Sequence, residues 1–211
     1  ADSLALLYDA PSLLSRTARA ALDAIDELAL ADPAQYPPAN GAQYPDSTFG
    51  TQMKEVAQLI KAGLGLRVAC VDIGGWDHHE NINNNLPPLL GELAATLAAF
   101  DADLGSTMAN VSVVSMTEFG RRAAQNASNG TDHGAASAMF VLGGGVAGGR
   151  VVADWPGLAE SRLFNGDLDV TTDYRQVLSE LIEDRLGGAD LARVFPGFVP
   201  AARTGLFLPR A

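Results

Sequence analysis

The sequence predicts an α/β fold, with a mostly parallel sheet flanked by helices, and three observations lead to it. Short apolar runs at 67–73, 111–116 and 139–142, the first of them rich in β-branched residues, are typical of buried strands. Longer segments between and around them carry apolar residues at helical spacing. A helix between two buried strands forms a right-handed βαβ unit, so we expect the first two strands to lie parallel.

The helical pattern occupies four segments, namely 14–28, 53–64, 90–104 and 174–182. The third helix is expected to begin at Asn85, with Pro87 and Pro88 in its first turn, where proline is tolerated. The fourth follows Asp173, and Gln176 is the expected partner in a capping box.

With 211 residues the chain is long enough for one domain with a substantial core and short for two. We expect residues 1–48 to form a helix and an irregular loop, and residues 49–186 to form the α/β core. The Gly- and Pro-rich residues 187–211 are expected to form a tail that wraps the domain.

Composition excludes two classes of partner. The chain has 25 acidic and 14 basic residues, a net charge of -11 and no basic stripe, so we expect no nucleic-acid binding. Its apolar runs are far shorter than the roughly 20 residues of a membrane span. The single cysteine, Cys70, cannot form an internal disulfide, and its apolar surroundings predict a buried side chain.

All three histidines lie in loops next to the predicted strands. Asp77 and His79 follow the first strand, and Asp132 and His133 precede the third. Carboxylate and imidazole groups bind divalent ions, and ligands bind outside the carboxyl ends of parallel strands. We therefore expect Asp77, His79 and His133 to converge on one ion; the alternative for His78 and His79 is an exposed, hydrogen-bonded loop pair.

The loop after the second strand carries Glu118, Arg121 and Arg122. We expect Glu118 to point toward the histidine cluster and Arg121 or Arg122 to line the same mouth, since these residues follow a predicted central strand. Arginine binds oxyanions through two parallel hydrogen bonds, whereas the alternative is a surface ion pair with Glu118.

The sequence lacks the residues or the residue spacing of several other catalytic motifs. A zinc deaminase needs a Pro-Cys-x-x-Cys segment, which a chain with one cysteine cannot supply. Asn83 stands where the zinc-protease motif needs its second histidine. The glycines at 143–145 lack the Lys-Ser/Thr ending of a phosphate-binding loop, and there is no Gly-x-Ser-x-Gly elbow.

Four motifs in order, at 74–79, 117–121, 130–134 and 140–144, give the chain a specific resemblance to the DUF1501 family. That family is distantly similar to the alkaline phosphatase and sulfatase superfamily, whose members use one or two divalent ions to polarise a phosphoryl or sulfuryl group. The resemblance implies an alkaline-phosphatase-like sheet, a zinc, manganese or calcium ion, a small anionic ester as substrate, and export from the cell.

The resemblance also assigns individual residues. Asp77 and His79 match the paired Asp and His that share one metal, and His133 matches the late histidine of the superfamily. Glu118 takes the place of an Asp that normally precedes a second histidine, but Phe119 follows it and cannot bind a metal. A second ion site is therefore either rebuilt around Asp132 or absent.

The superfamily's first metal-binding Asp and its nucleophile belong to an amino-terminal region that is expected to be missing here. Thr117 and Thr131 lie nearest the proposed ligands, but local structural roles account for both. We therefore expect this chain to bind a divalent ion with little or no ester turnover. The function implied is a metal-dependent hydrolase of phosphate or sulfate esters or a descendant; the alternative is a non-catalytic exported or surface-associated metal-binding protein.

Overall fold

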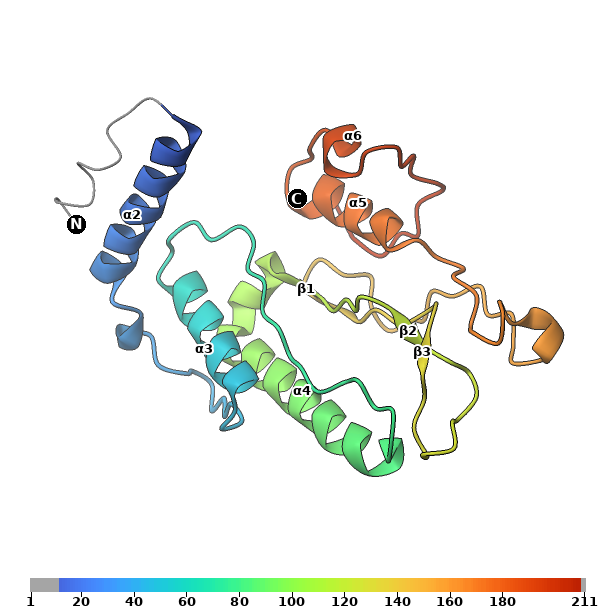
Figure 1. Cartoon of the computed structure of the whole chain (residues 1–211). Helices are drawn as coiled ribbons and strands as arrows, with labels where there is room; N and C mark the ends of the chain where they lie inside the picture. Colours follow the sequence, from blue (N-terminus) through green and yellow to red (C-terminus); the bar gives the residue numbers. More distant parts are fainter. Residues whose placement is uncertain (1–11, 210–211) are drawn as a thin grey trace. The chain divides into compact units, whose positions relative to one another are not determined.

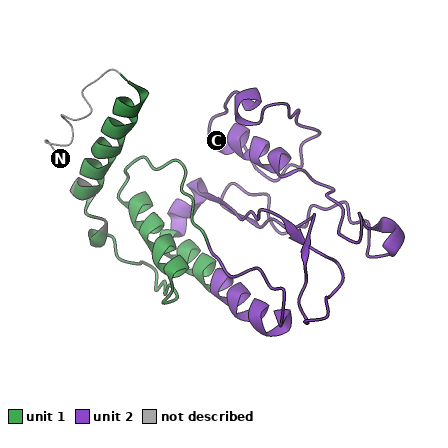
Figure 2. Cartoon of the chain, viewed as in Figure 1, with its two compact units in different colours: residues 1–72, 95–104 green, residues 73–94, 105–211 purple. Residues whose placement is uncertain are grey.

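The computed structural model describes residues 12–209, which divide into two compact units (Figure 2). The first unit runs up to residue 72 and adds 95–104, and the second comprises 73–94 with the chain from 105 onward. No helix within the described residues is long and apolar enough to cross a lipid bilayer.

The first unit contains two predicted helices, α2 (Leu13–Ala31) and α3 (Thr48–Lys61) (Figure 1). Each begins after a serine, Ser12 or Ser47, whose hydroxyl oxygen accepts a hydrogen bond from a backbone amide of the first turn. A short 3-10 helix, η2 (Pro33–Gln35), follows α2. The helical spacing read from 14–28 and 53–64 is therefore confirmed.

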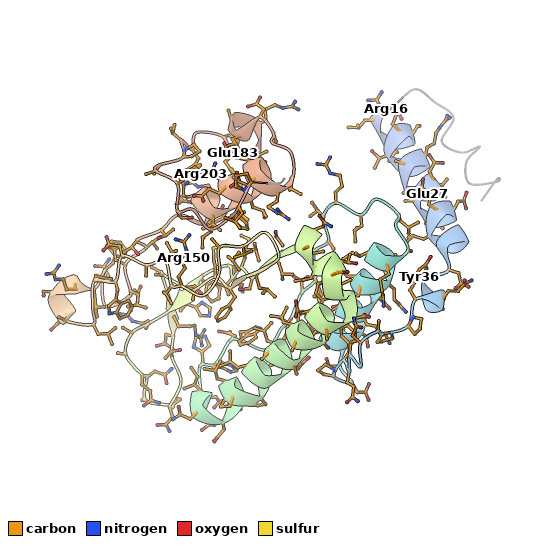
Figure 3. All side chains as sticks on the ribbon, turned by 180° about the vertical axis from the view of Figure 1, so that it is seen from behind. Arg16, Glu27, Tyr36, Arg150, Glu183 and Arg203 are labelled. Atoms are coloured by element: carbon orange, nitrogen blue, oxygen red, sulfur yellow. The ribbon has the colours of Figure 1, made fainter. Side chains whose placement is uncertain are left out.

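The core of the first unit is formed by α3 and residues 95–104 of α4 (Ile82–Leu104), which lie side by side in Figures 1 and 3. Both segments turn small and large apolar side chains away from solvent. The buried apolar residues here are Phe49, Met53, Ala57, Ala99, Phe100 and Leu104.

A carboxylate lies inside this core. Asp103 is 2% exposed, and its Oδ1 accepts hydrogen bonds from Lys61 Nζ and the Ala39 amide, both at 2.7 Å. Its Oδ2 accepts the hydroxyl of Tyr44 at 3.0 Å. Burial, followed by the hydrogen bond to Asp103, raises the pKa of Tyr44. Asp103 thus ties the loop before α3 to both helices.

The second unit holds the strands, and they pair differently from expectation. β1 (Ser112–Val114) and β4 (Val141–Gly143) lie where strands were predicted, but they pair antiparallel. β2 (Gly120–Arg121) and β3 (His133–Gly134) form a second antiparallel pair. Every sheet among the described residues has two strands, so the predicted mostly parallel, alkaline-phosphatase-like sheet is wrong for them.

The topology has a physical reason. A parallel return needs a crossover connection, usually a helix, but residues 115–140 contain none and fold back through the β2 and β3 pair. The run 67–73 is not a strand, because an apolar run becomes one only where another strand completes its backbone hydrogen bonds. Val68 is 64% exposed and Cys70 is exposed too, which corrects the expectation of buried side chains.

Helix α4 begins at Ile82, three residues earlier than expected, so Pro87 and Pro88 lie inside it rather than in its first turn. Proline has no backbone N–H, so the carbonyls of Asn83 and Asn84 cannot accept the usual helical hydrogen bond. After α4, the 3-10 helix η3 (Gly105–Asn110) leads into β1, and its Met108 is buried.

Helix α5 (Tyr174–Arg185) begins after Asp173, as predicted, and the Asp173 side chain accepts the Arg175 amide. The expected capping box is not formed, because the Gln176 side chain bonds Glu180 and the Ala201 amide instead. A short helix, α6 (Leu191–Val194), interrupts the tail.

The tail packs on α5 through a buried carboxylate. Glu180 is 1% exposed and accepts hydrogen bonds from the amides of Thr204 and Gly205 and from the Thr204 hydroxyl. At the surface, Arg203 pairs with Glu183 of α5 (Figure 3). Residues 203–205 of the tail are thus held against α5.

Acidification is expected to release this tail. Burial raises the pKa of Glu180, but hydrogen bonds from Thr204, Gln176 and Gly205 outweigh it and hold the pKa below its usual 4.5. A pKa lowered by folding contributes stability above the unfolded-state value, and this stability is lost as pH falls through the folded value. Hydrogen exchange of the Thr204 and Gly205 amides should therefore accelerate below pH 4.5 beyond the intrinsic pH effect.

In Glu180→Gln these amides should exchange faster at neutral pH and show little further loss of protection in acid. Glu183→Gln removes an exposed carboxylate from the same helix and serves as the matched control. Equal acid sensitivity in the unmodified protein and in Glu180→Gln would contradict the role of Glu180.

Candidate metal centre

Two loops of the second unit are joined by backbone contacts that fix the site. The Thr131 amide donates to the His78 carbonyl at 3.0 Å, and Glu80 forms an antiparallel bridge with Asn129. Gly130 makes this approach possible, because a Cβ there would overlap the backbone of His79 and Glu80. The loop before α4 therefore lies directly against the turn that leads into β3.

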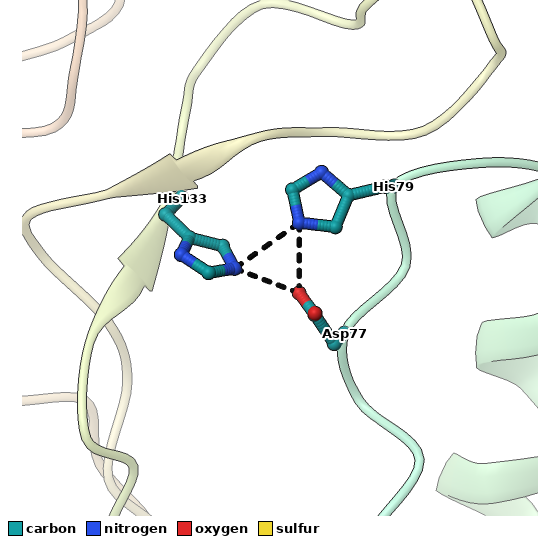
Figure 4. Close-up of side chains that lie close together, drawn as sticks. All are labelled: Asp77, His79 and His133. Atoms are coloured by element: carbon teal, nitrogen blue, oxygen red, sulfur yellow. Dashed lines mark hydrogen bonds and ion pairs between the residues drawn. The ribbon is translucent and has the colours of Figure 1, made fainter.

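Three side chains from these segments meet at one point (Figure 4). His133 Nε2 lies 2.9 Å from Asp77 Oδ1, His79 Nε2 lies 3.1 Å from the same oxygen, and the two Nε2 atoms are 3.1 Å apart. All three residues are exposed. The structure thus brings together the residues that the sequence predicted would converge, as a group able to hold a metal ion.

The triangle formed by these atoms has nearly equal sides, as one face of a coordination polyhedron would. With bonds of about 2.1 Å, neighbouring ligand atoms are separated by about 3.0 Å in an octahedron and about 3.4 Å in a tetrahedron. The observed separations of 2.9 to 3.1 Å are short enough for all three atoms to contact one ion.

Asp132, also predicted as a ligand, lies outside the three-atom group. Its Oδ1 is 3.0 Å from Nδ1 of His79, on the side of the ring away from the triangle, and accepts a hydrogen bond from the side-chain Nδ2 of Asn126 at 3.1 Å. Hydrogen bonds from Asn126 and then His79 lower the pKa of Asp132. A carboxylate in this position keeps a proton on Nδ1 and leaves the Nε2 lone pair of His79 for a metal.

Arg121 lies beside the group, held opposite His133 by the pairing of β2 with β3. Its Nη1 donates to Asp77 Oδ1 at 2.6 Å, and its Nε donates to the Thr131 hydroxyl at 3.1 Å. The other terminal nitrogen, Nη2, is buried without a hydrogen-bond partner in the described chain. Hydrogen bonds from His133 and then Arg121 lower the pKa of Asp77 and keep it anionic.

Two other predicted residues point elsewhere. Glu118 is exposed and forms no hydrogen bond or ion pair with any described residue. Arg122 donates to the Asn165 carbonyl at 2.7 Å and faces Asp167 at 3.5 Å, so it supports a neighbouring turn. Arg121 is therefore the arginine of this loop that contacts the three-atom group.

Phe119 and Asn126 contribute to the site, although neither was predicted to do so. The Phe119 ring stacks on the His133 imidazole, with centroids 4.0 Å apart and planes 27° from parallel. Asn126 Nδ2 bonds the His79 carbonyl and Asp132, while its Oδ1 accepts two amides of its own turn. Its position just before the Asn-Gly turn was the available sequence signal.

Comparison with known proteins identifies one family. The family described as "Protein of unknown function (DUF1501)" matches residues 3–179, which include every residue of the three-atom group. Searches of curated proteins and of solved structures find no match.

Proposed function

The chain belongs to the DUF1501 family, and we propose that Asp77, His79 and His133 hold a divalent ion for hydrolysis of phosphate or sulfate esters, or descend from such a site. The meeting of their three ligand atoms within 3.1 Å carries this proposal. The proposal includes the distant relationship to the alkaline phosphatase and sulfatase superfamily that the sequence resemblance implies.

With both histidines neutral, an ion explains the three short contacts better than protons do. Asp132 holds the neutral His79 with its proton on Nδ1, so His79 Nε2 then has no hydrogen to donate. Asp77 is an acceptor, and a neutral His133 can donate to only one of the two remaining atoms. A cation would accept lone pairs from all three atoms at once. Two imidazole nitrogens among the ligands favour zinc or manganese over calcium, because calcium prefers oxygen ligands.

The surroundings suit an anionic substrate. A bound ion would act as a Lewis acid toward a phosphoryl or sulfuryl oxygen and would lower the pKa of a water molecule. Arg121 is fixed beside Asp77 through its Nη1, which places a guanidinium charge next to the candidate ion site. This combination of a cation site and a positioned guanidinium supports an ester of phosphate or sulfate as the ligand.

A second candidate is a non-catalytic metal-binding protein, exported or surface-associated. The observation in its favour concerns the two candidate hydroxyl nucleophiles. Thr117 donates to Ser137 at 2.9 Å, and Thr131 accepts from Arg121. Within the described part of the chain, neither hydroxyl bonds a carboxylate or imidazole that would remove its proton.

Turnover of nitrophenyl phosphate and nitrophenyl sulfate separates the two candidates. If the protein is a hydrolase, its ester hydrolysis should disappear when a chelator is added and return with zinc or manganese. Metal binding without turnover would support the second candidate, and absence of metal binding would exclude both.

Arg121→Ala is expected to weaken binding of inorganic phosphate to the zinc-loaded protein by about 10-fold or more, because a charge-assisted hydrogen bond is worth about 1.5–3 kcal/mol. Titration calorimetry measures this affinity. Arg122→Ala is the matched control, because Arg122 contacts Asn165 and Asp167 instead. Equal phosphate affinity in both variants would show that Arg121 does not bind the anion.

A further inference from the structure

A pocket of about 400 Å³ opens beside the three-atom group. Asp77 and His79 form part of its lining, and Gly75, Pro88 and Leu89 form another part. This volume is near the lower end of the range of about 300–1,000 Å³ typical of small-molecule sites. An ester bound at the ion would therefore have space next to it for a small organic group.

The apolar part of the lining is built by the packing of the Gly75 loop on α4. Gly75 has φ 93°, and a Cβ there would lie 3.3 Å from Leu89 Cδ1. Glycine thus leaves the face of Leu89 open, and the exposed Pro88 ring extends the same surface. An aryl or alkyl group would lose contact with water against these two side chains.

The polar part of the lining includes one carboxylate besides Asp77, that of Glu80. Glu80 lines the pocket, and Asn85 donates from its side chain to the Glu80 carbonyl at 3.2 Å. His78, 6% exposed, also lines it, and its buried Nε2 has no hydrogen-bond partner among the described residues. The Glu80 carboxylate repels a second negative charge on a ligand.

We propose that this pocket receives the organic group of the ester and selects small, uncharged, aryl-sized groups over groups that carry a further anion. The proposal rests on the proposed function, because it needs the phosphoryl or sulfuryl group at the ion. It adds the substrate class: monoesters of small neutral alcohols or phenols, with polyphosphates and nucleotides disfavoured.

Phosphonates, which are not hydrolysed, test the pocket by titration calorimetry on the zinc-loaded protein. Phenylphosphonate should bind about 10-fold more tightly than methylphosphonate, as expected for apolar contacts of this size. Leu89→Ala should reduce this ratio to about 2- to 3-fold. Leu90→Ala, an exposed neighbour on the same helix outside the pocket, should keep the ratio unchanged.

A second test of the pocket uses a charged ligand together with a variant, Glu80→Gln, that leaves the apolar side chains of the pocket unchanged. 4-Carboxyphenylphosphonate should bind several-fold more weakly than phenylphosphonate, and Glu80→Gln should remove most of that difference. Equal affinities for phenyl- and methylphosphonate, or a ratio that survives Leu89→Ala, would overturn the pocket proposal alone. If no phosphonate binds the zinc-loaded protein, the proposed function fails and this proposal fails with it.

Discussion

Replacing His133 with alanine is expected to raise the dissociation constant for zinc or manganese by more than about 100-fold. Loss of a residue that only orients a metal ligand costs about 10- to 100-fold in affinity, so loss of a ligand atom should cost more. His79→Ala should show the same large effect. Asp132→Asn should fall within the 10- to 100-fold range, because Asp132 contacts Nδ1 of His79 and not the three-atom group.

Competition with a chromophoric chelator measures these affinities in the folded variants. Glu118→Gln is an informative control, because Glu118 was predicted to lie at the site whereas the structure shows it exposed and without a partner among residues 12–209. It should leave metal affinity unchanged. An unchanged affinity in His133→Ala, or a loss in Glu118→Gln as large as in His79→Ala, would show that the ion is held elsewhere.

The residues of the three-atom group could be predicted without the correct sheet. Asp77 and His79 lie in a loop marked by two glycines, and His133 follows an Asn-Gly turn, so local chemistry identified both segments. Their convergence depends on a backbone bridge between Glu80 and Asn129 and on the absence of a side chain at Gly130. Neither the bridge nor the need for glycine at position 130 produces a periodic pattern that could be recognised in a single sequence.

The roles of Asp132 and Glu118 depend on which way their side chains point, and not on their positions in the sequence. Asp132 directly precedes the candidate ligand His133 in the sequence. Its carboxylate, however, lies against the other histidine, at Nδ1 of His79, and not at the Nε2 atom of the three-atom group. Glu118 is next to Phe119, whose ring reaches His133 while the carboxylate remains in solvent. Sequence spacing cannot decide which neighbour in a loop faces the site, because no strand or helix fixes the alternation there.

The predicted sheet failed for a different reason. The spacing identified β1 and β4 and the helix before them, but strand order and direction depend on contacts between distant segments. The run 67–73 has the composition of a strand buried on both faces, yet Val68 is 64% exposed. An apolar, β-branched composition favours a strand, but a segment becomes one only where neighbouring strands and packing partners are present.

Asp103→Ala is expected to lower the free energy of unfolding of the first unit by about 3–5 kcal/mol, as when one partner of a buried ion pair is removed. The Lys61 ammonium, whose side chain is 17% exposed, would lose its counter-charge. The Ala39 amide and the Tyr44 hydroxyl would lose their acceptor at the same time. Leaving these donors without their acceptor is costly because the Asp103 side chain itself is buried.

Urea unfolding monitored by circular dichroism, together with hydrogen exchange of the α3 amides, measures this loss. Asp101→Asn changes an exposed carboxylate two residues earlier on the same helix and should stay within about 0.5 kcal/mol of the unmodified protein. Asp103→Asn, which keeps the shape but removes the charge, should also lower the raised pKa of Tyr44, because the hydrogen bond and charge of Asp103 both favour the protonated phenol. The pKa should remain above its usual value, since burial is the larger cause. Unchanged stability in Asp103→Ala, with an unchanged ultraviolet titration of Tyr44 in Asp103→Asn, would mean that this carboxylate does not hold the first unit together.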